Sequence, residues 1–561
     1  MKKKLPKMKF AEDFPTEEAV LSEHDQGAPK AAQAGDAQSA GQQIARATGT
    51  VMIAFIVVSL IGVVHQMVIT RVFGVSASLD SFYAANRITE LLFNLMAGGA
   101  LGSAFIPMFT GFLTREDKKG AWKLASGVLN TVTLILVVIS VLVWIFAPQI
   151  VEHGLFILAA DANLGQLDET VRLLRIILPS VIIFGISGLV MGMLNAHQSF
   201  LVPALAPGFY SLGIIFGALW LPSSWGIDRL AVGVVLGALA HLLVQLPSLI
   251  RLPGRFYQLT VGFRDKAVQK VLTLMIPRVI GAGVVQLNFL ANTVIALSLG
   301  EGAASAVTLA FALMLMPQRA IGQSAGIASL PTLSAQAELG KTAEMRQLMA
   351  SILRAMLLLA APASVGMIIL RVPIVQVLYE GGEFSTTATQ MVAWALLWYS
   401  LGLIGHSLVE VLSRAFYAVH DTRTPVLVGV GAMSLNILLS IVFSRWFQSL
   451  GWMAHGGLAL ANSLATGLES LILLVLVRKK LQGINGREVL KGGLTSLAGS
   501  AIMGLAVYGF ITYVPLSSRV LSLIGGVVIG VIVYALVLWL LRVPEFTSVQ
   551  KAILARLHRQ A

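Results

Sequence analysis

Apolar runs about as long as one bilayer crossing recur from residue 51 to residue 541, with short polar loops between them. A transmembrane α-helix needs about 20 mostly apolar residues. The pattern therefore predicts fourteen transmembrane helices. They lie near residues 51–72, 82–113, 121–148, 170–196, 202–221, 229–250, 270–298, 303–333, 346–371, 388–418, 424–446, 455–477, 490–513 and 519–541. Several runs are longer than a bilayer requires, which predicts tilted or bent helices. Bends are expected at Pro179, Pro277, Pro317 and Pro331.

The composition supports an all-α polytopic membrane protein. Of the 561 residues, 56% are hydrophobic and 12% are charged, and the mean hydropathy is +0.82. A soluble globular protein needs a larger share of charged residues to cover its surface. The fourteen helices leave few residues for a soluble domain. The chain has no cysteine, which excludes disulfides and thiolate metal sites.

The basic residues indicate the orientation in the membrane. The net charge is +13, but Lys and Arg cluster in the loops at 115–123, 251–270 and 478–491. They do not line one helix face, so a nucleic-acid partner is not expected. The loops on the other side, 152–169 and 379–384, are acidic or neutral. Because positively charged loops stay in the cytoplasm, both termini are predicted to be cytoplasmic.

The two ends of the chain are polar. Residues 1–46 begin MKKKLPKMK without an apolar core behind the lysines, so they do not match a secretory signal. We expect a disordered cytoplasmic tail that is either passive or held at the lipid surface by its lysines. Residues 546–561 are expected to form a second cytoplasmic tail.

An internal repeat divides the predicted helices into two sets. The tetrapeptide AFIP at 104–107 corresponds to ASLP at 328–331, an offset of 224 residues, and each is followed by a polar loop and a new helix. Six helices separate the copies, so both sets enter the membrane from the same side, as in parallel repeats of transporters. Chance similarity between leucine-rich helices is the alternative. The repeat predicts an N-lobe at 47–251, a C-lobe at 252–482 and two additional helices at 483–545.

Motifs of enzymes are missing from the sequence. It has no Walker A pattern, and its nine histidines form no H-E-x-x-H motif. We therefore expect a transporter rather than an enzyme, with no metal or other cofactor. Transport would be coupled to the membrane potential or to a gradient of Na⁺ or H⁺.

Polar residues inside the apolar runs are the candidates for a substrate cleft between the lobes. Such groups are costly in a membrane and by default mark a functional path. Arg71 and Arg319 lie near helix ends or kinks, so their side chains could instead reach the membrane interface. Asp80 and Arg87 are two helical turns apart and could pair, cap a helix or contact substrate. The candidate cleft residues are His65, Arg71, Asp80, Asn86, Arg87, Arg278, Gln286, Asn292 and Arg319.

A second group lies in the predicted C-lobe. His406, Glu410 and Arg414 follow one another at intervals of one helical turn, a spacing that favours local charge pairing. The group is either a buried structural triad or a proton or cation site that couples transport.

The stretch from Arg71 to Pro107 carries a resemblance to a known family. It contains an R-x-F-G turn, an aspartate six residues after the glycine, an aromatic pair, a Gly-Gly pair and then AFIP. This pattern resembles the MurJ/MviN family of lipid II flippases, within the superfamily of multidrug, oligosaccharidyl-lipid and polysaccharide exporters. The similarity extends from about residue 48 to the C-terminus.

The resemblance implies a flippase of the bacterial plasma (inner) membrane that acts in cell wall synthesis by alternating access. Its substrate would be a lipid-linked anionic glycan, lipid II, whose pyrophosphate and sugar head lies in a cationic cleft. The polyprenyl tail would lie in a groove beside the last two helices. The bilayer and cell wall synthesis enzymes would be its partners.

The sequence departs from this family at the cleft. The resemblance implies arginines at positions where this chain has Ser59, His65, Phe93 and Ala312. Either the cleft is rebuilt or the substrate is less anionic than lipid II. The alternatives are a flippase for another polyprenyl-linked glycan, a cation-coupled exporter of small molecules and a membrane scaffold that transports nothing. The two additional helices disfavour the exporter, and the polar residues and the repeat disfavour the scaffold.

Overall fold

The computed structural model describes residues 54–96, 100–159, 164–514, 516 and 518–546. Within these ranges it does not describe the side chains of residues 96, 100–103, 277, 278 and 280. The predicted tail at 1–46 and residues 547–561 lie outside the described part. Regular structure in the described part is helical, apart from one isolated bridge between Gly381 and Phe384.

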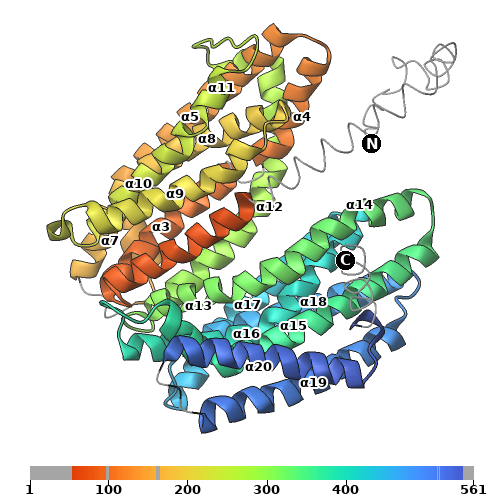
Figure 1. Cartoon of the computed structure of the whole chain (residues 1–561). Coiled ribbons are helices and arrows are strands. Elements are labelled where there is room, and N and C mark those ends of the chain that lie inside the picture. Colours follow the sequence, from red (N-terminus) through yellow and green to blue (C-terminus); the bar gives the residue numbers. More distant parts are fainter. Residues whose placement is uncertain (1–53, 97–99, 160–163, 515, 517, 547–561) are drawn as a thin grey trace, which may run out of the picture. The chain divides into compact units, whose positions relative to one another are not determined.

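The helices follow one another with short connections (Figure 1). In chain order they are Ala54–Phe73, α3 (Ala77–Met96), α4 (Ala100–Thr114), α5 (Lys118–Ile145), α6 (Ala147–Ile150), η1 (Val151–Leu155), α7 (Leu164–Ile177), α8 (Pro179–Ala196), α9 (Leu201–Trp220), η2 (Ser223–Trp225), α10 (Asp228–Leu243), α11 (Leu246–Ile250), η3 (Gly262–Arg264), α12 (Lys266–Leu297), α13 (Ala303–Gln318), η4 (Arg319–Gln323), α14 (Ser324–Glu338), α15 (Thr342–Leu378), α16 (Thr386–Ala418), α17 (Arg423–Ser449), α18 (His455–Lys480), α19 (Gly486–Tyr513) and α20 (Arg519–Leu540).

Each predicted apolar run coincides with a helix or a pair of helices. Within the described residues, twelve helices are long and apolar enough to cross a membrane, and the bent helix α12 makes a thirteenth. The predicted run at 82–113 is formed by α3 and α4, with residues 97–99 outside the described part. The all-α membrane fold predicted from the sequence is confirmed.

Three of the four candidate prolines lie at irregular points of the helices. Pro179 begins α8 directly after α7 ends. The two halves of α12 are inclined by 47° across the interval that contains Pro277. Pro317 precedes the π-helical turn η4, whereas α14 continues through Pro331. A proline removes one backbone hydrogen bond, and a neighbouring kink or wider turn accommodates its ring.

The spanning helices pack into two groups. We call the helices within residues 57–250 the N-lobe and the helices α13 to α18 the C-lobe. In the N-lobe α8 contacts α4, α5 and α10, and α9 runs along α10; in the C-lobe α16 contacts α13, α15 and α18. Helix α12 contributes to both groups. In its first half Val268, Val271 and Met275 are buried among side chains of α4, α5 and α8, and its second half hydrogen-bonds to α17.

Small residues allow α9 and α10 to lie very close together. A Cβ atom at Gly217 would be 2.5 Å from the Cα atom of Gly233, and one at Gly213 would be 2.2 Å from the Cα atom of Gly237. Helices without hydrophobic attraction between them, as in lipid, gain stability from such close backbone packing.

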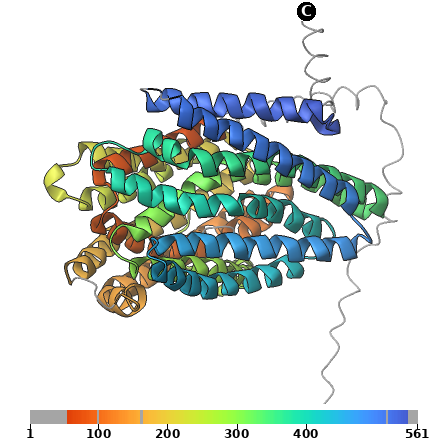
Figure 2. The same ribbon diagram turned by 90° about the horizontal axis from the view of Figure 1, so that it is seen from below.

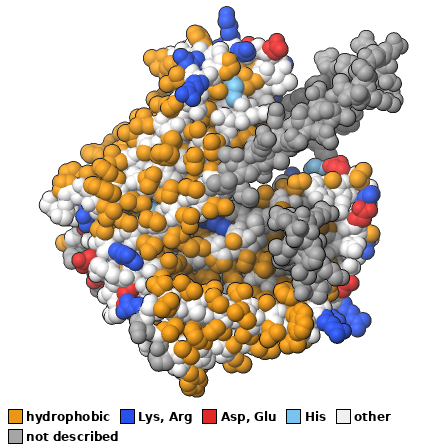
Figure 3. Space-filling view, in the orientation of Figure 1, with side chains coloured by type: hydrophobic (Ala, Val, Ile, Leu, Met, Phe, Trp, Pro, Cys, Tyr) orange, Lys and Arg blue, Asp and Glu red, His pale blue; other side chains and the backbone are white. Residues whose placement is uncertain are grey.

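The last two helices, α19 and α20, pack against each other and against α15. In Figures 1 and 2 these blue helices lie side by side at the edge of the structure, next to the green α15. Figure 3 shows hydrophobic side chains over most of the visible helical surface, with the charged side chains gathered mainly near the helix ends. This distribution suits helices that are surrounded by lipid along their length.

Candidate functional site

Asp80 joins the two lobes. Its carboxylate accepts hydrogen bonds from the backbone N–H groups of Gly302 and Ser305, both at 2.6 Å, and from the Ser305 hydroxyl at 2.6 Å. The first N–H groups of a helix have no partner within the helix, and an anion there is favoured. Asp80, which is 1% exposed, therefore caps α13 from the other lobe. Asp80 does not pair with Arg87. It is one of the candidates that the sequence predicts for contact with substrate, but in the structure its oxygens accept hydrogen bonds from the start of α13.

A second contact mirrors this cap. The backbone N–H of Ala77, at the start of α3, donates to Glu301 Oε1 at 3.2 Å. The two residues are 224 positions apart, which equals the offset between the repeated tetrapeptides. Each lobe thus supplies a carboxylate to the first turn of the corresponding helix in the other lobe.

Arg71 lies at the end of the first spanning helix, where the chain touches the loop between α15 and α16. Its carbonyl oxygen accepts from the Glu383 N–H at 2.9 Å, and the Arg71 residue is exposed. A Cβ at Gly74 would be 2.5 Å from the Glu383 carbonyl oxygen, and Gly74 has φ +64°. The R-x-F-G turn therefore needs its glycine for this contact, and the exposed arginine suits a place at the membrane interface.

Arg87 is the centre of a charged group on α3. Its guanidinium forms an ion pair with Glu90 at 2.7 Å, donates to Thr293 Oγ1 at 3.3 Å and lies 5.3 Å from the ring centre of Phe289. Asn86 donates to the other Glu90 oxygen at 3.0 Å. The Arg87 side chain is 20% exposed and the Glu90 side chain 44%. Glu90 thus balances the charge of Arg87, with α12 on the far side of the guanidinium.

His65 is not part of that group. Its Nε2 is buried and has no hydrogen-bond partner among the described residues. The neighbouring Gln66 donates to the Tyr83 hydroxyl at 2.9 Å and links the first spanning helix to α3.

Asn292 belongs to an uncharged network between α12 and α17. Asn288 and Asn292 both donate to Asn436 Oδ1, at 3.0 and 2.7 Å, and Ser440 donates to Asn292 Oδ1 at 3.0 Å. Asn288, Asn436 and Ser440 are buried. Because each amide oxygen here has a donor, the network stabilises the helix pair without a net charge.

The other candidate cleft residues are more scattered. Gln286 is half-buried on α12, and Arg319 is exposed in the turn η4. Arg278 lies in α12, but its side chain is outside the described part. The structure therefore brings together Asn86 and Arg87 at Glu90, and places Arg71, Asp80 and Asn292 at separate contacts. Arg319 is exposed and takes part in none of these contacts.

The predicted triad in the C-lobe is divided. Glu410 and Arg414 form an ion pair on α16, and Gln318 donates to Glu410 at 3.5 Å. His406 instead bonds to Asn462 Oδ1 on α18 at 2.9 Å. A further carboxylate, Glu469, lies half-buried on α18, opposite Gly429, and has no ion pair among the described residues. Glu469 lies within a predicted span but is not among the candidate residues predicted from the sequence.

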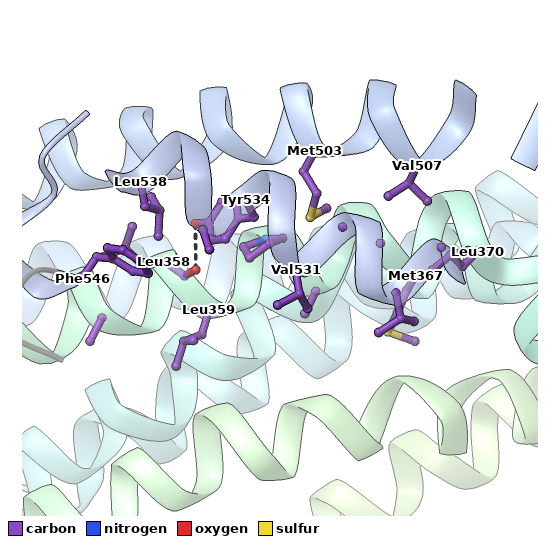
Figure 4. Close-up of a pocket in the computed structure, with 18 of the residues that line it drawn as sticks. Leu358, Leu359, Met367, Leu370, Met503, Val507, Val531, Tyr534, Leu538 and Phe546 are labelled. Atoms are coloured by element: carbon purple, nitrogen blue, oxygen red, sulfur yellow. Dashed lines mark hydrogen bonds between the residues drawn. The ribbon is translucent and has the colours of Figure 1, made fainter. Parts of the chain in front are cut away.

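An apolar cavity lies between α15, α19 and α20. Its volume is about 620 Å³. Figure 4 shows Leu358, Met367 and Leu370 facing Met503, Val531 and Tyr534 across it. The Tyr534 hydroxyl donates to the Leu358 carbonyl at 2.8 Å. At one end of this cavity Arg354 pairs with Glu488 at 3.1 Å and with Glu545 at 3.0 Å.

Comparisons with known proteins agree with this architecture. Residues 69–529 match the family model described as lipid II flippase MurJ. The lipid II flippase MurJ of Burkholderia cenocepacia is 31% identical over 424 residues, which cover 75% of this chain and 81% of that protein. The probable lipid II flippase MurJ of Vibrio cholerae is 31% identical over 434 residues, which cover 76% and 81%.

A solved structure has the same fold. The lipid II flippase MurJ in an inward closed conformation has a TM-score of 0.73 and 24% identity, and the match covers 90% of this chain and 99% of that one. The family model matches most of the chain, and the relatives are covered over most of their own length. The chain belongs to the MurJ family of lipid II flippases.

Proposed function

We propose that this protein flips lipid II from the cytoplasmic to the outer leaflet of the bacterial plasma membrane by alternating access. The observation that carries the proposal is the apolar cavity beside α19 and α20, separate from the polar residues between the lobes. A water-soluble cargo has no use for such a cavity, whereas a lipid-linked cargo needs separate places for its polar head and its tail. The polyprenyl tail fits the cavity, since it is lined almost entirely by apolar side chains.

Both termini are placed in the cytoplasm, following the positively charged loops. The turn at 74–76, the turn at 298–302 and the loop at 379–384 then lie on the outer side. We propose that the contacts of Asp80, Glu301 and Arg71 hold that side closed while the head is loaded from the cytoplasm. Release of the head requires these contacts to break.

The pyrophosphate of the head is proposed to bind at Arg87. A phosphate oxygen can replace the Glu90 carboxylate on the guanidinium, because both form charge-assisted hydrogen bonds. Arg278, a candidate from the sequence, is proposed as a second cation for the head. No cofactor is needed, since outward movement of one negative charge across an inside-negative membrane gains about 2.3 kcal/mol per 100 mV. A contribution from Na⁺ or H⁺ would involve His406, Glu410 or Arg414, and cell wall synthesis enzymes would use the flipped lipid.

Complementation tests the function. The protein is expressed in a bacterium depleted of its own lipid II flippase, and access of an external reagent to lipid II is measured. We expect rescue by the unchanged chain and loss of rescue with Gly530→Leu, whose side chain would fill the apolar cavity. A Cβ at Gly530 would already lie 3.3 Å from Val507. The matched control is Gly509→Leu, because no atom lies within 4 Å of a Cβ there.

A second candidate is a flippase for another polyprenyl-linked glycan. It is favoured by Phe93 and Ala312, which stand where the family resemblance implies arginines. Expression and membrane insertion without rescue would support this candidate and contradict transport of lipid II.

A further inference from the structure

A pocket lined by both polar and apolar side chains lies in the N-lobe, apart from the apolar cavity. Its volume is about 400 Å³, which falls within the range of about 300–1,000 Å³ common for ligand pockets. Helices α3, α8, α9 and α10 form its walls. Its lining residues include Asn86, Glu90, Phe93, Asn94, Tyr210 and His241. It shares Asn86 and Glu90 with the charged group around Arg87, so it borders the proposed pyrophosphate site.

Several polar groups in this pocket have no partner from the protein. Within the described part of the chain, neither the Tyr210 hydroxyl nor the Asn94 amide makes a hydrogen bond. His241 is held by one ring nitrogen, since its Nδ1 lies 2.7 Å from Ser187 Oγ, and Gln245 donates to the same serine at 2.8 Å. The Nε2 of His241 remains without a described partner. Hydroxyl, amide and imidazole groups left unpaired in a pocket are suited to an uncharged polar ligand.

Aromatic rings form one wall of the pocket. The ring of Phe184 lies 5.0 Å from that of Phe93, 5.1 Å from that of Tyr210 and 5.4 Å from that of His241. Such rings offer broad apolar faces with little conformational freedom to lose. The C–H faces of a sugar ring pack on surfaces of this kind, while its hydroxyls reach the polar groups around them.

The charge of the pocket argues against a phosphate. No Lys or Arg is among its lining residues, and its one carboxylate, Glu90, is bound to Arg87 and Asn86. Phe93 stands at a position where the family resemblance implies an arginine. An anion in this pocket would therefore lose its water without gaining a cationic partner, whereas a neutral glycan needs none.

We propose that this N-lobe pocket binds the sugar part of the lipid-linked head while Arg87 holds the pyrophosphate. The proposal rests on the proposed function, because it requires a polyprenyl-linked glycan as the substrate. It assigns recognition of the glycan to aromatic rings and neutral hydrogen-bonding groups, where relatives are implied to have a more cationic cleft.

The test compares two lipids that differ in the sugar. The full-length protein in lipid nanodiscs is titrated with lipid II and with undecaprenyl pyrophosphate, which lacks the glycan. We expect Tyr210→Phe and Asn94→Ala each to weaken binding of lipid II about three- to tenfold, the effect of one hydrogen bond. Binding of undecaprenyl pyrophosphate should be unchanged. The matched control is Tyr508→Phe on α19, where the tyrosine is 61% exposed, and it should change neither affinity.

The outcomes separate the two proposals. If the unchanged protein binds neither lipid, both the proposed function and the glycan pocket are overturned. If it binds lipid II no more tightly than undecaprenyl pyrophosphate, or if Tyr210→Phe and Asn94→Ala leave lipid II affinity unaltered, the pocket assignment alone is overturned. An equal loss of affinity for both lipids would also overturn it, because the pocket would then not distinguish the lipid with the sugar from the lipid without it.

Discussion

Asp80 and Arg87 lie on the same helix two turns apart, yet their side chains have unrelated partners. Asp80 bonds to the first turn of α13, and Arg87 bonds to Glu90 and Thr293. Both residues satisfy the rule that a charge at membrane depth must be paired or hydrogen-bonded. Asp80 therefore belongs to the joint between the lobes, and Arg87 to the proposed substrate site.

Loss of the Asp80 cap should destabilise the protein. We expect Asp80→Ala to cost about 1–3 kcal/mol for each buried N–H that it leaves unpaired. The matched control is Asp228→Ala at the start of α10, where the ion pair with Arg172 is partly exposed and is worth about 0–1 kcal/mol. Thermal unfolding in detergent measures both. Equal melting temperatures for the two variants would contradict the cap.

Asp421 should make stability dependent on pH at the acidic end. The Lys480 ammonium at 2.5 Å and the hydrogen bonds from Thr424 lower the pKa of Asp421 to about 2. The Asp421 carboxyl therefore stays ionised in the folded state at a pH where it takes up a proton in the unfolded state, near pH 4. The contribution of Asp421 to the stability of the folded state is present above about pH 4 and is lost as the pH falls towards 2.

The variant Asp421→Asn tests this dependence. Its melting temperature should change less between pH 4 and pH 2 than that of the unchanged chain, because the group that titrates is gone. Parallel curves for the two proteins would contradict the assignment.

At the scale of elements, α9 and α10 depend on glycine. Gly217→Ala places a methyl group 2.5 Å from the Gly233 Cα, so the helices must separate, at an expected cost of about 1–3 kcal/mol. Gly431→Ala on α17 is the control, since no atom lies within 4 Å of its Cβ. Alanine also has the higher helix propensity, so that variant should be at least as stable as the unchanged chain. Thermal unfolding of the two variants would show the difference, and equal stabilities would contradict close packing as the reason for Gly217.

The whole molecule should transport only if the contacts between α3 and α13 open. The chain has no cysteine, so a pair introduced by Ala77→Cys and Glu301→Cys can be joined with a short, reducible cross-linker. We expect cross-linking to stop rescue of flippase activity and reduction to restore it. A short cross-linker can span the two positions, because the Ala77 N–H lies 3.2 Å from the Glu301 carboxylate.

A second pair controls for the chemistry. Ser78→Cys and Glu169→Cys replace groups that lie 3.1 Å apart within the N-lobe, so their cross-link leaves the lobes free to move. Transport should survive it. Undiminished transport by the cross-linked Ala77 and Glu301 positions would contradict alternating access through this joint.

The spanning helices were predictable from local sequence alone. A run of about 20 apolar residues in a bilayer has few options other than a helix, because its backbone groups must bond within the segment. Proline has no backbone N–H to form such a bond. The positions of Pro179, Pro277 and Pro317 therefore indicated where helices break or widen. Pro331 did not, since α14 continues through it.

The partners of the polar side chains were decided by the tertiary structure. Asp80 could have paired with Arg87, capped a helix or touched substrate, and the choice depended on α13, more than 200 residues away in the chain. His406, Glu410 and Arg414 have triad spacing, yet α18 draws His406 to Asn462. Local sequence determines the helices because their hydrogen bonds close within four residues. It does not determine the site, because each charge bonds to whatever group the packing of distant helices brings near.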